Sequence, residues 1–159
     1  DKQTSGCLVL AKNKKSVKNF SNLSKAHQIK KNYIAVVKGK FKGKEVISNE
    51  IYKKNSLKLK KSKSVFKLVK HLKKASIVSV DIQTGRTHQI RIHASQLQHP
   101  ILFDNKYGDV LFNKAIDIDF RRTLALHANS ISFKDQNSKV IKVTAKYPDE
   151  LKNLIEALM

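Results

Sequence analysis

Short apolar stretches separated by polar turns run along the whole chain of 159 residues, and they restrict the folds that it can adopt. Strand-like alternation or clustering of apolar residues occurs at 7–11, 33–38, 45–52, 65–72, 76–82, 124–133 and 139–145. The stretch 7–11 predicts a buried strand. The turn-rich residues 134–138 separate the stretches 124–133 and 139–145, which predicts that these two form a hairpin. Because short turns join most of these strands, the pattern favours an α+β domain over a doubly wound parallel sheet.

Three helices are expected between and after these strands. Asn13 can cap the first helix, Thr87 can cap the second, which ends before Pro100, and Asp149 can cap the last. Helical spacing defines an apolar face on each: Val17, Phe20 and Leu23 on the first, Ile90, Ala94 and Leu97 on the second, and Leu151, Leu154, Ile155 and Leu158 on the third. These faces predict helices that pack against a sheet.

The chain is strongly basic. It has 33 Lys and Arg residues against 12 Asp and Glu residues, which gives a net charge of +21 and a pI near 10.1. This balance favours a polyanionic partner such as a nucleic acid, although a codon bias toward lysine in the source organism produces the same excess. In the most basic region, 53–74, lysines interleave with apolar residues. We expect a solvated strand pair there, whose outer face tracks a phosphate backbone or forms a merely soluble charged surface.

Length and cysteine content set further bounds. A chain with 40% hydrophobic residues can bury one ordinary core, so we expect a single domain. Cys7 is the only cysteine, which excludes an internal disulfide and a cysteine-based zinc site. There is no apolar run as long as a membrane span, and we expect no signal peptide. We therefore expect a soluble cytoplasmic protein that has no membrane partner.

The ten residues 84–93, TGRTHQIRIH, concentrate chemistry that the rest of the chain lacks. The chain has only four arginines, and two of them, Arg86 and Arg91, lie here. Where lysine serves almost everywhere else, arginine indicates bidentate pairing or a buried charge. Arg86 is expected at the helix N-terminus, where free N–H groups favour an anion, and a buried Arg91 needs a carboxylate from elsewhere in the chain. The histidines in and after this run are spaced by five and six residues, on different helical faces, which argues against a metal site.

Five segments carry fixed motifs in a fixed order. They are DKQTSGCLVLAK at 1–12, KNYIAVVKG at 31–39, TGRTHQIRIH at 84–93, HPI with DNKYG within 99–108, and LHA with a later Phe within 126–133. The first resembles D-x-x-T-S-G-L-L-x-x-A-K, the second resembles K-x-Y-x-A-x-V-x-G, and the third resembles T-G-R-T-H-Q-[IL]-R-x-H. These are motifs of the RluA-type pseudouridine synthases, so the chain resembles that family over almost its whole length. The resemblance implies a mixed, mostly antiparallel sheet with flanking helices and an RNA-binding cleft.

The resemblance also implies an activity: isomerisation of uridine to pseudouridine in RNA, with base flipping and without a cofactor. By the family's pattern Asp1 carries the carboxylate chemistry, Tyr33 stacks on the uracil and assists proton removal from C5, and Arg91 pairs with Asp1 and keeps it an anion. The candidates for contacts with the RNA or the flipped nucleotide are Thr4, Arg86, His88 and Gln89. We expect the protein to act as a monomer with RNA as its partner.

Several of these residues have structural alternatives. Tyr33 could be an ordinary core aromatic of its strand, and Asp104 could hold its loop rather than contact substrate. His127 is expected to be a hydrogen-bonding structural residue rather than a catalytic one. Arg121 and Arg122 lie where the family similarity is weak, and we expect them at the surface or on RNA.

The chain also departs from the family pattern. Members normally carry His-Arg-Leu before the catalytic aspartate, whereas this sequence starts at Asp1, so we expect residues 1–159 to be a catalytic domain that is incomplete at its N-terminus and lacks any upstream S4-type domain. The phrase HPILFD at 99–104 looks more like the RluC-type enzymes of large-subunit ribosomal RNA. A transfer RNA substrate stays open, as does a noncatalytic RNA-binding or ribosome-assembly protein on the same scaffold. A basic structural protein of the ribosomal type would lack a pocket that joins Asp1, Tyr33 and Arg91.

Overall fold

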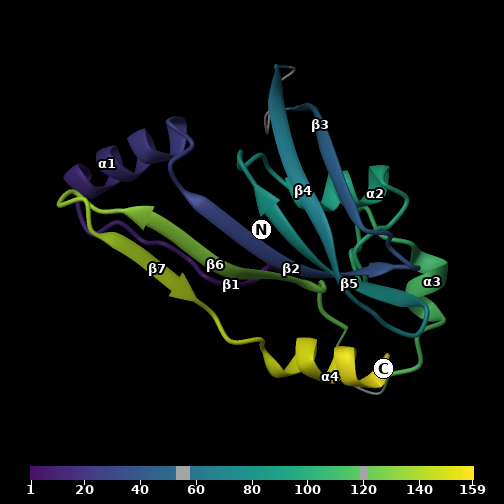
Figure 1. Cartoon of the computed structure of the whole chain (residues 1–159). Helices are drawn as coiled ribbons and strands as arrows, with labels where there is room; N and C mark the ends of the chain where they lie inside the picture. Colours follow the sequence, from purple (N-terminus) through teal and green to yellow (C-terminus); the bar gives the residue numbers. More distant parts are fainter. Residues whose placement is uncertain (53–57, 119–121) are drawn as a thin grey trace.

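One twisted seven-stranded sheet organises the chain, and its helices lie around that sheet (Figure 1). The computed structural model describes residues 1–52, 58–118 and 122–159. The strands are β1 (Ser5–Gly6), β2 (Lys30–Lys38), β3 (Lys44–Tyr52), β4 (Leu59–His71), β5 (Ala75–Ile82), β6 (Leu126–Lys134) and β7 (Val140–Thr144). The helices are α1 (Lys14–Lys25), α2 (Gln89–Gln96), α3 (Val110–Lys114) and α4 (Asp149–Ala157).

The strand order is β1-β6-β2-β5-β4-β3, with β7 paired to β6. Among the strands of the described residues, only the short β1–β6 pair is parallel, and the other pairs are antiparallel. In Figure 1, β2, β6 and β7 cross the lower left, β3 and β4 rise toward the top, and α4 lies along the bottom. The predicted α+β class with a mixed, mostly antiparallel sheet is therefore confirmed, as is the hairpin of β6 and β7.

The core lies on the two central strands. Ala35, Val36 and Val37 of β2 and Val78 and Val80 of β5 are fully buried, so both faces of these strands are covered. Burying one such valine side chain contributes about 1.5–3 kcal/mol, which makes this strand pair the strongest part of the domain. The predicted apolar face of α2 packs on this core, and so do Leu151 and Leu154 of α4.

The prediction of a buried strand at 7–11 is wrong. Strand β1 contains only Ser5 and Gly6, and the side chains of Leu8 and Leu10 are each 81% exposed. The reason lies in the partner strand: β1 pairs with His127 and Ala128, but from Ser130 onward the same edge of β6 is taken by β7. A longer β1 would have no free edge to pair with, so the chain leaves the sheet toward α1.

The helix ends confirm one expected cap and correct two. Asn13 Oδ1 accepts the N–H of Ser16 at 2.9 Å, as predicted for α1. At α2 the capping position belongs to His88, in a left-handed conformation and without a side-chain cap, so Thr87 does not cap it. At α4 that position belongs to Pro148. Asp149 is instead the first helical residue, where its charge interacts favourably with the helix dipole.

Helix α3 was not predicted. It has five residues, too few for a clear apolar period, and Asp109 caps it by accepting the N–H of Phe112 at 2.8 Å.

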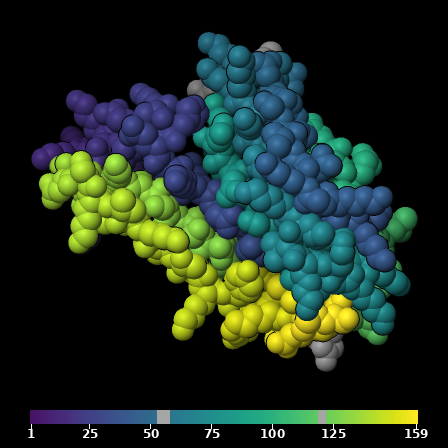
Figure 2. Space-filling model, viewed as in Figure 1, coloured from purple at the N-terminus to yellow at the C-terminus, as the bar shows by residue number. Residues whose placement is uncertain are grey.

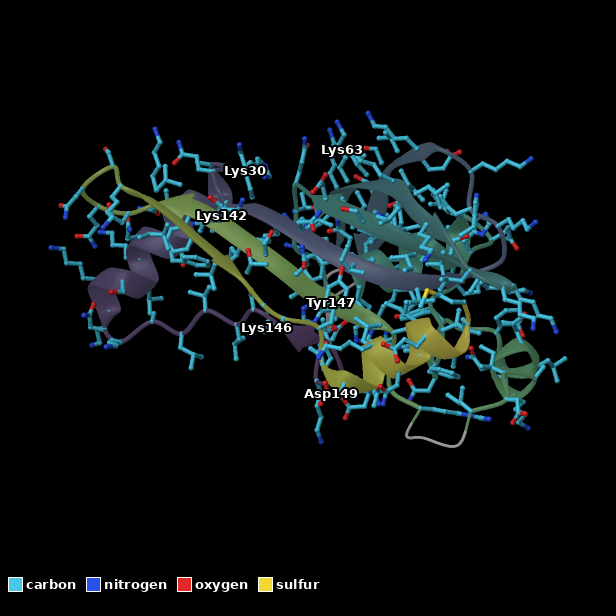
Figure 3. The ribbon with its side chains drawn as sticks, turned by 60° about the horizontal axis from the view of Figure 1, so that its bottom comes forward. Lys30, Lys63, Lys142, Lys146, Tyr147 and Asp149 are labelled. Carbon is cyan, nitrogen blue, oxygen red and sulfur yellow. The ribbon has the colours of Figure 1, made fainter. Side chains whose placement is uncertain are left out.

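The described part of the lysine-rich region 53–74 forms one strand, β4, and not the expected strand pair, because the partners of β4, β3 and β5, lie outside that region. Strands β3 and β4 pair antiparallel over their shared length, and Ser62, Ser64 and Phe66 point into the protein while Lys61 and Lys67 are exposed. Residues 53–57 of this region lie outside the described residues. Figure 3 shows the lysine side chains spread over the surface, with Lys30 of β2 and Lys63 of β4 on the same side of the molecule.

The surface is notched between α1 and the strands β3 and β4 (Figure 2). Across residues 1–52, 58–118 and 122–159, none of the helices has the length and apolar character needed to span a membrane.

Candidate active site

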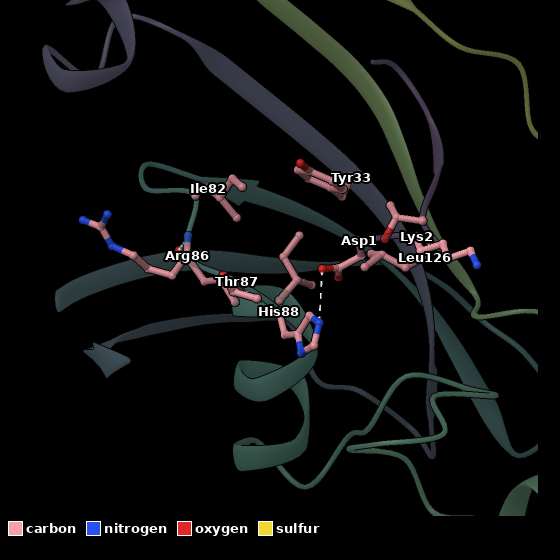
Figure 4. A pocket seen from close by; sticks show the side chains of 12 residues that line it. Asp1, Lys2, Tyr33, Ile82, Arg86, Thr87, His88 and Leu126 are labelled. Atoms are coloured by element: carbon pink, nitrogen blue, oxygen red, sulfur yellow. Dashed lines mark hydrogen bonds and ion pairs between the residues drawn. The ribbon is translucent and has the colours of Figure 1, made fainter. Parts of the chain in front are cut away.

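A pocket of about 480 Å³ opens where the N-terminal turn meets the start of α2 (Figure 4). Its walls come from four parts of the chain that are distant in sequence. They are Asp1, Lys2 and Thr4 from the first turn, Tyr33 from β2, Ile82 to Ile90 from the end of β5 and the start of α2, and Leu126 from β6. Ile82, Ile90 and Leu126 supply an apolar wall, while Asp1, Arg86 and His88 supply charge and hydrogen-bonding groups. A volume in this range accommodates a small ligand or a single flipped nucleoside.

The segment that carries Asp1 is fastened to β6. The Thr4 N–H donates to the Asp1 carbonyl at 3.3 Å and closes a turn, and Ser5 Oγ lies 2.9 Å from His127 Nδ1. Gly6 has φ +105°, and a Cβ there would lie 2.3 Å from the Ala128 carbonyl oxygen, so only glycine fits. His127 is buried and also bonds the carbonyl of Ala145, which confirms its predicted structural role.

Two side chains of the 84–93 run face the carboxylate of Asp1. His88 Nε2 lies 3.5 Å from Oδ1, and Arg91 Nη1 lies 3.8 Å from Oδ2. The Asp1 side chain is 17% exposed, so it is largely withdrawn from solvent but open to the pocket. The structure thus brings Asp1, Arg91 and His88 together, and Tyr33 lines the same pocket (Figure 4).

The closest partner of Arg91 is Asp104, not Asp1. Nε and Nη2 of Arg91 donate to the two Asp104 oxygens at 2.7 and 2.6 Å, and both side chains are buried. Burial alone would raise the pKa of Asp104, but the Arg91 hydrogen bonds and the N–H groups of Tyr107 and Lys106 outweigh it and lower that pKa. The same hydrogen bonds raise the pKa of Arg91. The expectation that Asp1 is the main carboxylate of Arg91 is therefore corrected, and Asp104 holds its own loop, the alternative considered for it.

His88 is held in place by Tyr107. Its backbone is left-handed, with φ 57°, and Nδ1 lies 3.1 Å from the Tyr107 hydroxyl. The Tyr107 ring in turn packs under the Arg91 guanidinium, 5.3 Å from its centroid. Burial, followed by the charges of Arg91 and Lys106, lowers the pKa of His88, which favours the neutral form of its ring. The other ring nitrogen, Nε2, is the one that faces Asp1, 3.5 Å from its Oδ1.

Gln89 organises the loop that precedes α2. Its side-chain oxygen accepts from Thr84 Oγ1 at 2.7 Å and from the Arg86 N–H at 3.0 Å, and its nitrogen donates to the Lys63 carbonyl and to Ser64 Oγ. Both polar atoms are thus engaged by the protein itself. Arg86 donates its Nε–H to the Lys61 carbonyl at 3.1 Å and stays at the rim of the pocket.

A buried polar network behind the site escaped sequence reasoning. His93 is fully buried, with Nδ1 2.9 Å from Ser64 Oγ and Nε2 2.8 Å from Asn49 Oδ1. Burial lowers the pKa of His93 to about 4. The network joins α2 to β3 and β4, and serines that alternate at 62 and 64 within a lysine-rich strand are the sequence signal that could have revealed it.

The Tyr33 side chain lies between the pocket and the apolar core. It lines the pocket, packs against the apolar core, and has its pKa raised by burial and then by Cys7. Thr4 Oγ1 is buried at the pocket wall and has no hydrogen-bond partner among the described residues.

The other residues singled out in the sequence lie apart from the pocket. His99 Nδ1 bonds the Lys38 carbonyl at 2.7 Å, and its ring packs against Phe41. Arg122 donates to the Ile116 carbonyl and stacks over Phe103. Arg121 lies outside the described residues.

Comparison with known proteins identifies the family to which the chain belongs. A family model described as RNA pseudouridylate synthase matches residues 1–96, which include the segments of Asp1, Tyr33 and Arg91. The chain belongs to the RNA pseudouridylate synthase family. Its resemblance to the RluA-type members, inferred from the motifs, is confirmed.

Bacterial relatives align over nearly all of the chain. It is 31% identical over 170 residues to "Ribosomal large subunit pseudouridine synthase C" of Haemophilus influenzae, covering 99% of this chain and 53% of the relative. The protein of the same name from Buchnera aphidicola subsp. Baizongia pistaciae is 36% identical over 172 residues, covering 98% of the chain and 55% of the relative. The chain thus spans about half the length of these relatives.

Two solved structures share the fold. "Human RNA Pseudouridylate Synthase Domain Containing 1" superposes with a TM-score of 0.79 at 25% identity, covering 99% of this chain and 77% of that one. "Human RNA Pseudouridylate Synthase Domain Containing 4" superposes with a TM-score of 0.74 at 17% identity, covering 97% and 75%. The sheet and flanking helices are therefore the fold of this family.

Proposed function

We propose that the chain forms the catalytic part of a pseudouridine synthase that modifies uridines of large-subunit ribosomal RNA. The observation that carries this proposal is the position of Asp1, whose carboxylate opens into the pocket that Tyr33 lines and lies 3.8 Å from Arg91. Membership of the family supports the reaction. The names of the bacterial relatives support ribosomal RNA as the substrate.

The reaction needs no atom from outside the substrate and solvent. The N1–C1′ bond of the uridine breaks, the uracil turns within the pocket, C5 bonds to C1′, the C5 proton leaves and N1 gains a proton. Asp1 acts as the anion that attacks the ribose or otherwise carries the carboxylate chemistry, and the opposite charge of Arg91 stabilises it. Tyr33 stacks on the uracil and takes part in removing the C5 proton. No cofactor enters these steps.

The target base has to leave its stack to reach the pocket, which costs a few kcal/mol that contacts elsewhere offset. Arg86 and His88 are the candidates at the rim and beside Asp1, and Thr4 has a free hydroxyl at the wall. Gln89 acts through the loop that its hydrogen bonds hold in shape. We propose that the enzyme acts as a cytoplasmic monomer with RNA as its partner.

The substrate is tested with transcripts. The full chain is incubated with large-subunit ribosomal RNA and, separately, with a transfer RNA pool, and pseudouridine is mapped by carbodiimide labelling and primer extension. The proposal predicts pseudouridine in the ribosomal RNA. Pseudouridine in transfer RNA alone would mean that transfer RNA, and not ribosomal RNA, is the substrate. Tight RNA binding without any pseudouridine would favour a noncatalytic RNA-binding protein.

A further inference from the structure

Lys31 lies beside the pocket and has no assigned role. Side chains alternate along a strand, so Lys31 and Tyr33 leave β2 on the same face, the one that carries the pocket. Lys31 and Tyr33 also line the adjoining hollow together. An ideal Cβ on Gly85 would lie 3.4 Å from Lys31 Nζ, which places this ammonium directly against the loop that carries Arg86.

Lys31 and Arg86 form a pair of cations without an anion. The ion pairs of the described residues involve neither side chain. Lys31 is partly buried, and burial, followed by the charge of Arg86, lowers its pKa. Two like charges near each other, one of them partly buried, destabilise the free protein, and a ligand that carries the opposite charge would relieve this repulsion.

The surrounding groups do not neutralise this pair. Asn32, on the opposite face of β2, bonds Ser79 and Asp81, and Asp81 also pairs with Lys67. On the α1 side, His27 Nδ1 lies 2.8 Å from the Gln83 carbonyl and fixes that end of the loop. The nearby carboxylate of Asp81 thus has Asn32 and Lys67 as its partners, and not Lys31.

Arg86 is preset for an external anion. Its Nε–H is bound by the Lys61 carbonyl at 3.1 Å and its backbone N–H by Gln89, so the position of the guanidinium is fixed. Neither Nη group has a partner among the described residues, and a guanidinium edge binds a phosphate better than an ammonium can alone.

We propose that Lys31 and Arg86 together bind one phosphodiester group of the RNA, next to the nucleotide whose base enters the pocket. The site rests on the proposed function because its ligand is the RNA substrate. The base would lie against Tyr33 and the apolar wall, while its backbone stays at the rim, where both cations stand. Binding would also relieve the repulsion between the two cations, so binding energy is gained where the base is extruded.

The test compares Lys31→Gln with Lys30→Gln, a matched loss of one charge on the neighbouring exposed residue of the same strand. The full chain, carrying Asp1→Asn to prevent turnover, is titrated with a large-subunit ribosomal RNA transcript at several salt concentrations. Lys31→Gln is expected to weaken binding about tenfold and to reduce the salt slope by about 0.7–0.9, the value of one phosphate contact. Lys30→Gln is expected to change both much less, and Lys31→Arg to retain the slope.

Thermal unfolding separates binding from folding. Lys31→Gln is expected to leave Tm unchanged or to raise it, because it removes a repelled cation, whereas a structural lysine would lower it. Equal effects of Lys31→Gln and Lys30→Gln on RNA binding would overturn the site. Inorganic phosphate and uridine monophosphate are titrated in parallel, and binding of either as tight as that of RNA would overturn the assignment to an RNA phosphodiester.

Turnover is measured separately with the wild-type aspartate. If the wild type makes pseudouridine and Lys31→Gln binds and reacts like Lys30→Gln, the site is wrong and the function stands. If the wild type makes none but Lys31→Gln selectively weakens RNA binding, the function is wrong and the phosphate site stands.

Discussion

Arg91 bonds Asp104 through two hydrogen bonds of 2.7 and 2.6 Å, whereas its approach to Asp1 is 3.8 Å. The buried Arg91–Asp104 ion pair therefore supports the site, because it fixes the guanidinium that faces the Asp1 carboxylate. An arginine held in this way is preorganised, and the longer contact leaves Asp1 able to engage substrate.

Breaking this ion pair should destabilise the protein. Asp104→Asn leaves the buried Arg91 charge with only the longer contact to Asp1, and we expect a loss of up to about 3–5 kcal/mol in the free energy of unfolding. Denaturant unfolding measures it, with Asp149→Asn as the control because that carboxylate is exposed and pairs only with Lys152. Similar small losses in the two variants would contradict the role given to Asp104.

The stability of the domain should fall in mild acid because of His93. Its folded pKa of about 4 lies below the usual 6.5, so the unfolded chain binds the proton more readily. This contribution is complete above pH 6.5 and is lost progressively as the pH falls toward 4, by about 3 kcal/mol in all. Unfolding free energies measured between pH 7 and 4 should show this slope in the wild type and a smaller one in His93→Gln, where the lowered pKa of His88 still acts in the same direction. The lowered pKa of Asp104 adds a separate loss only below its ordinary value of 3.8.

Gly6 should be required for placing Asp1. An alanine there has both an unfavourable φ of +105° and a Cβ 2.3 Å from the Ala128 oxygen, so β1 has to leave β6. We expect Gly6→Ala to abolish most of the activity. Gly43→Ala is the matched control, since Gly43 also has positive φ but no atom within 4 Å of its ideal Cβ. We expect Gly43→Ala to retain most of the activity, and equal activity in the two variants would contradict the requirement for glycine at position 6.

His88 should act on Asp1 through its Nε2–H. His88→Gln retains an N–H group near that position, whereas His88→Leu removes it. We expect His88→Leu to lower kcat about tenfold to a hundredfold with little change in KM, and His88→Gln to recover part of the loss. Steady-state kinetics on ribosomal RNA measure this, and a rise in KM at constant kcat would instead make His88 an RNA contact.

Much of the fold could be predicted because it depends on local patterns. The alternation in β5 and the spacing of Ile90, Ala94 and Leu97 in α2 each report a buried face, and the structure has them as expected. The stretch 7–11 carries the same apolar signal, yet it is exposed because β7 occupies the edge that it would need. Strand competition of this kind depends on residues more than a hundred positions away, so no local pattern contains it.

The candidate site could likewise be predicted only in part from the sequence. Motif resemblance indicated Asp1, Tyr33 and Arg91, and the structure places Asp1 and Tyr33 in the wall of one pocket and Arg91 3.8 Å from Asp1. The pairing of Arg91 with Asp104 was missed as the main ion pair, because two carboxylates were available and only the geometry distinguishes them. Lys31 is the first residue of the K-x-Y-x-A-x-V-x-G motif, but the motif alone assigns it no role, and what sets it apart from the other lysines is its burial beside Arg86.

The central claim is that Asp1 performs pseudouridine formation in this pocket. The most direct measurement is release of C5 tritium from labelled large-subunit ribosomal RNA by the full chain, compared between the wild type, Asp1→Asn and the surface control Asp135→Asn. We predict release by the wild type and by Asp135→Asn, and none by Asp1→Asn. Undiminished release by Asp1→Asn would contradict the account.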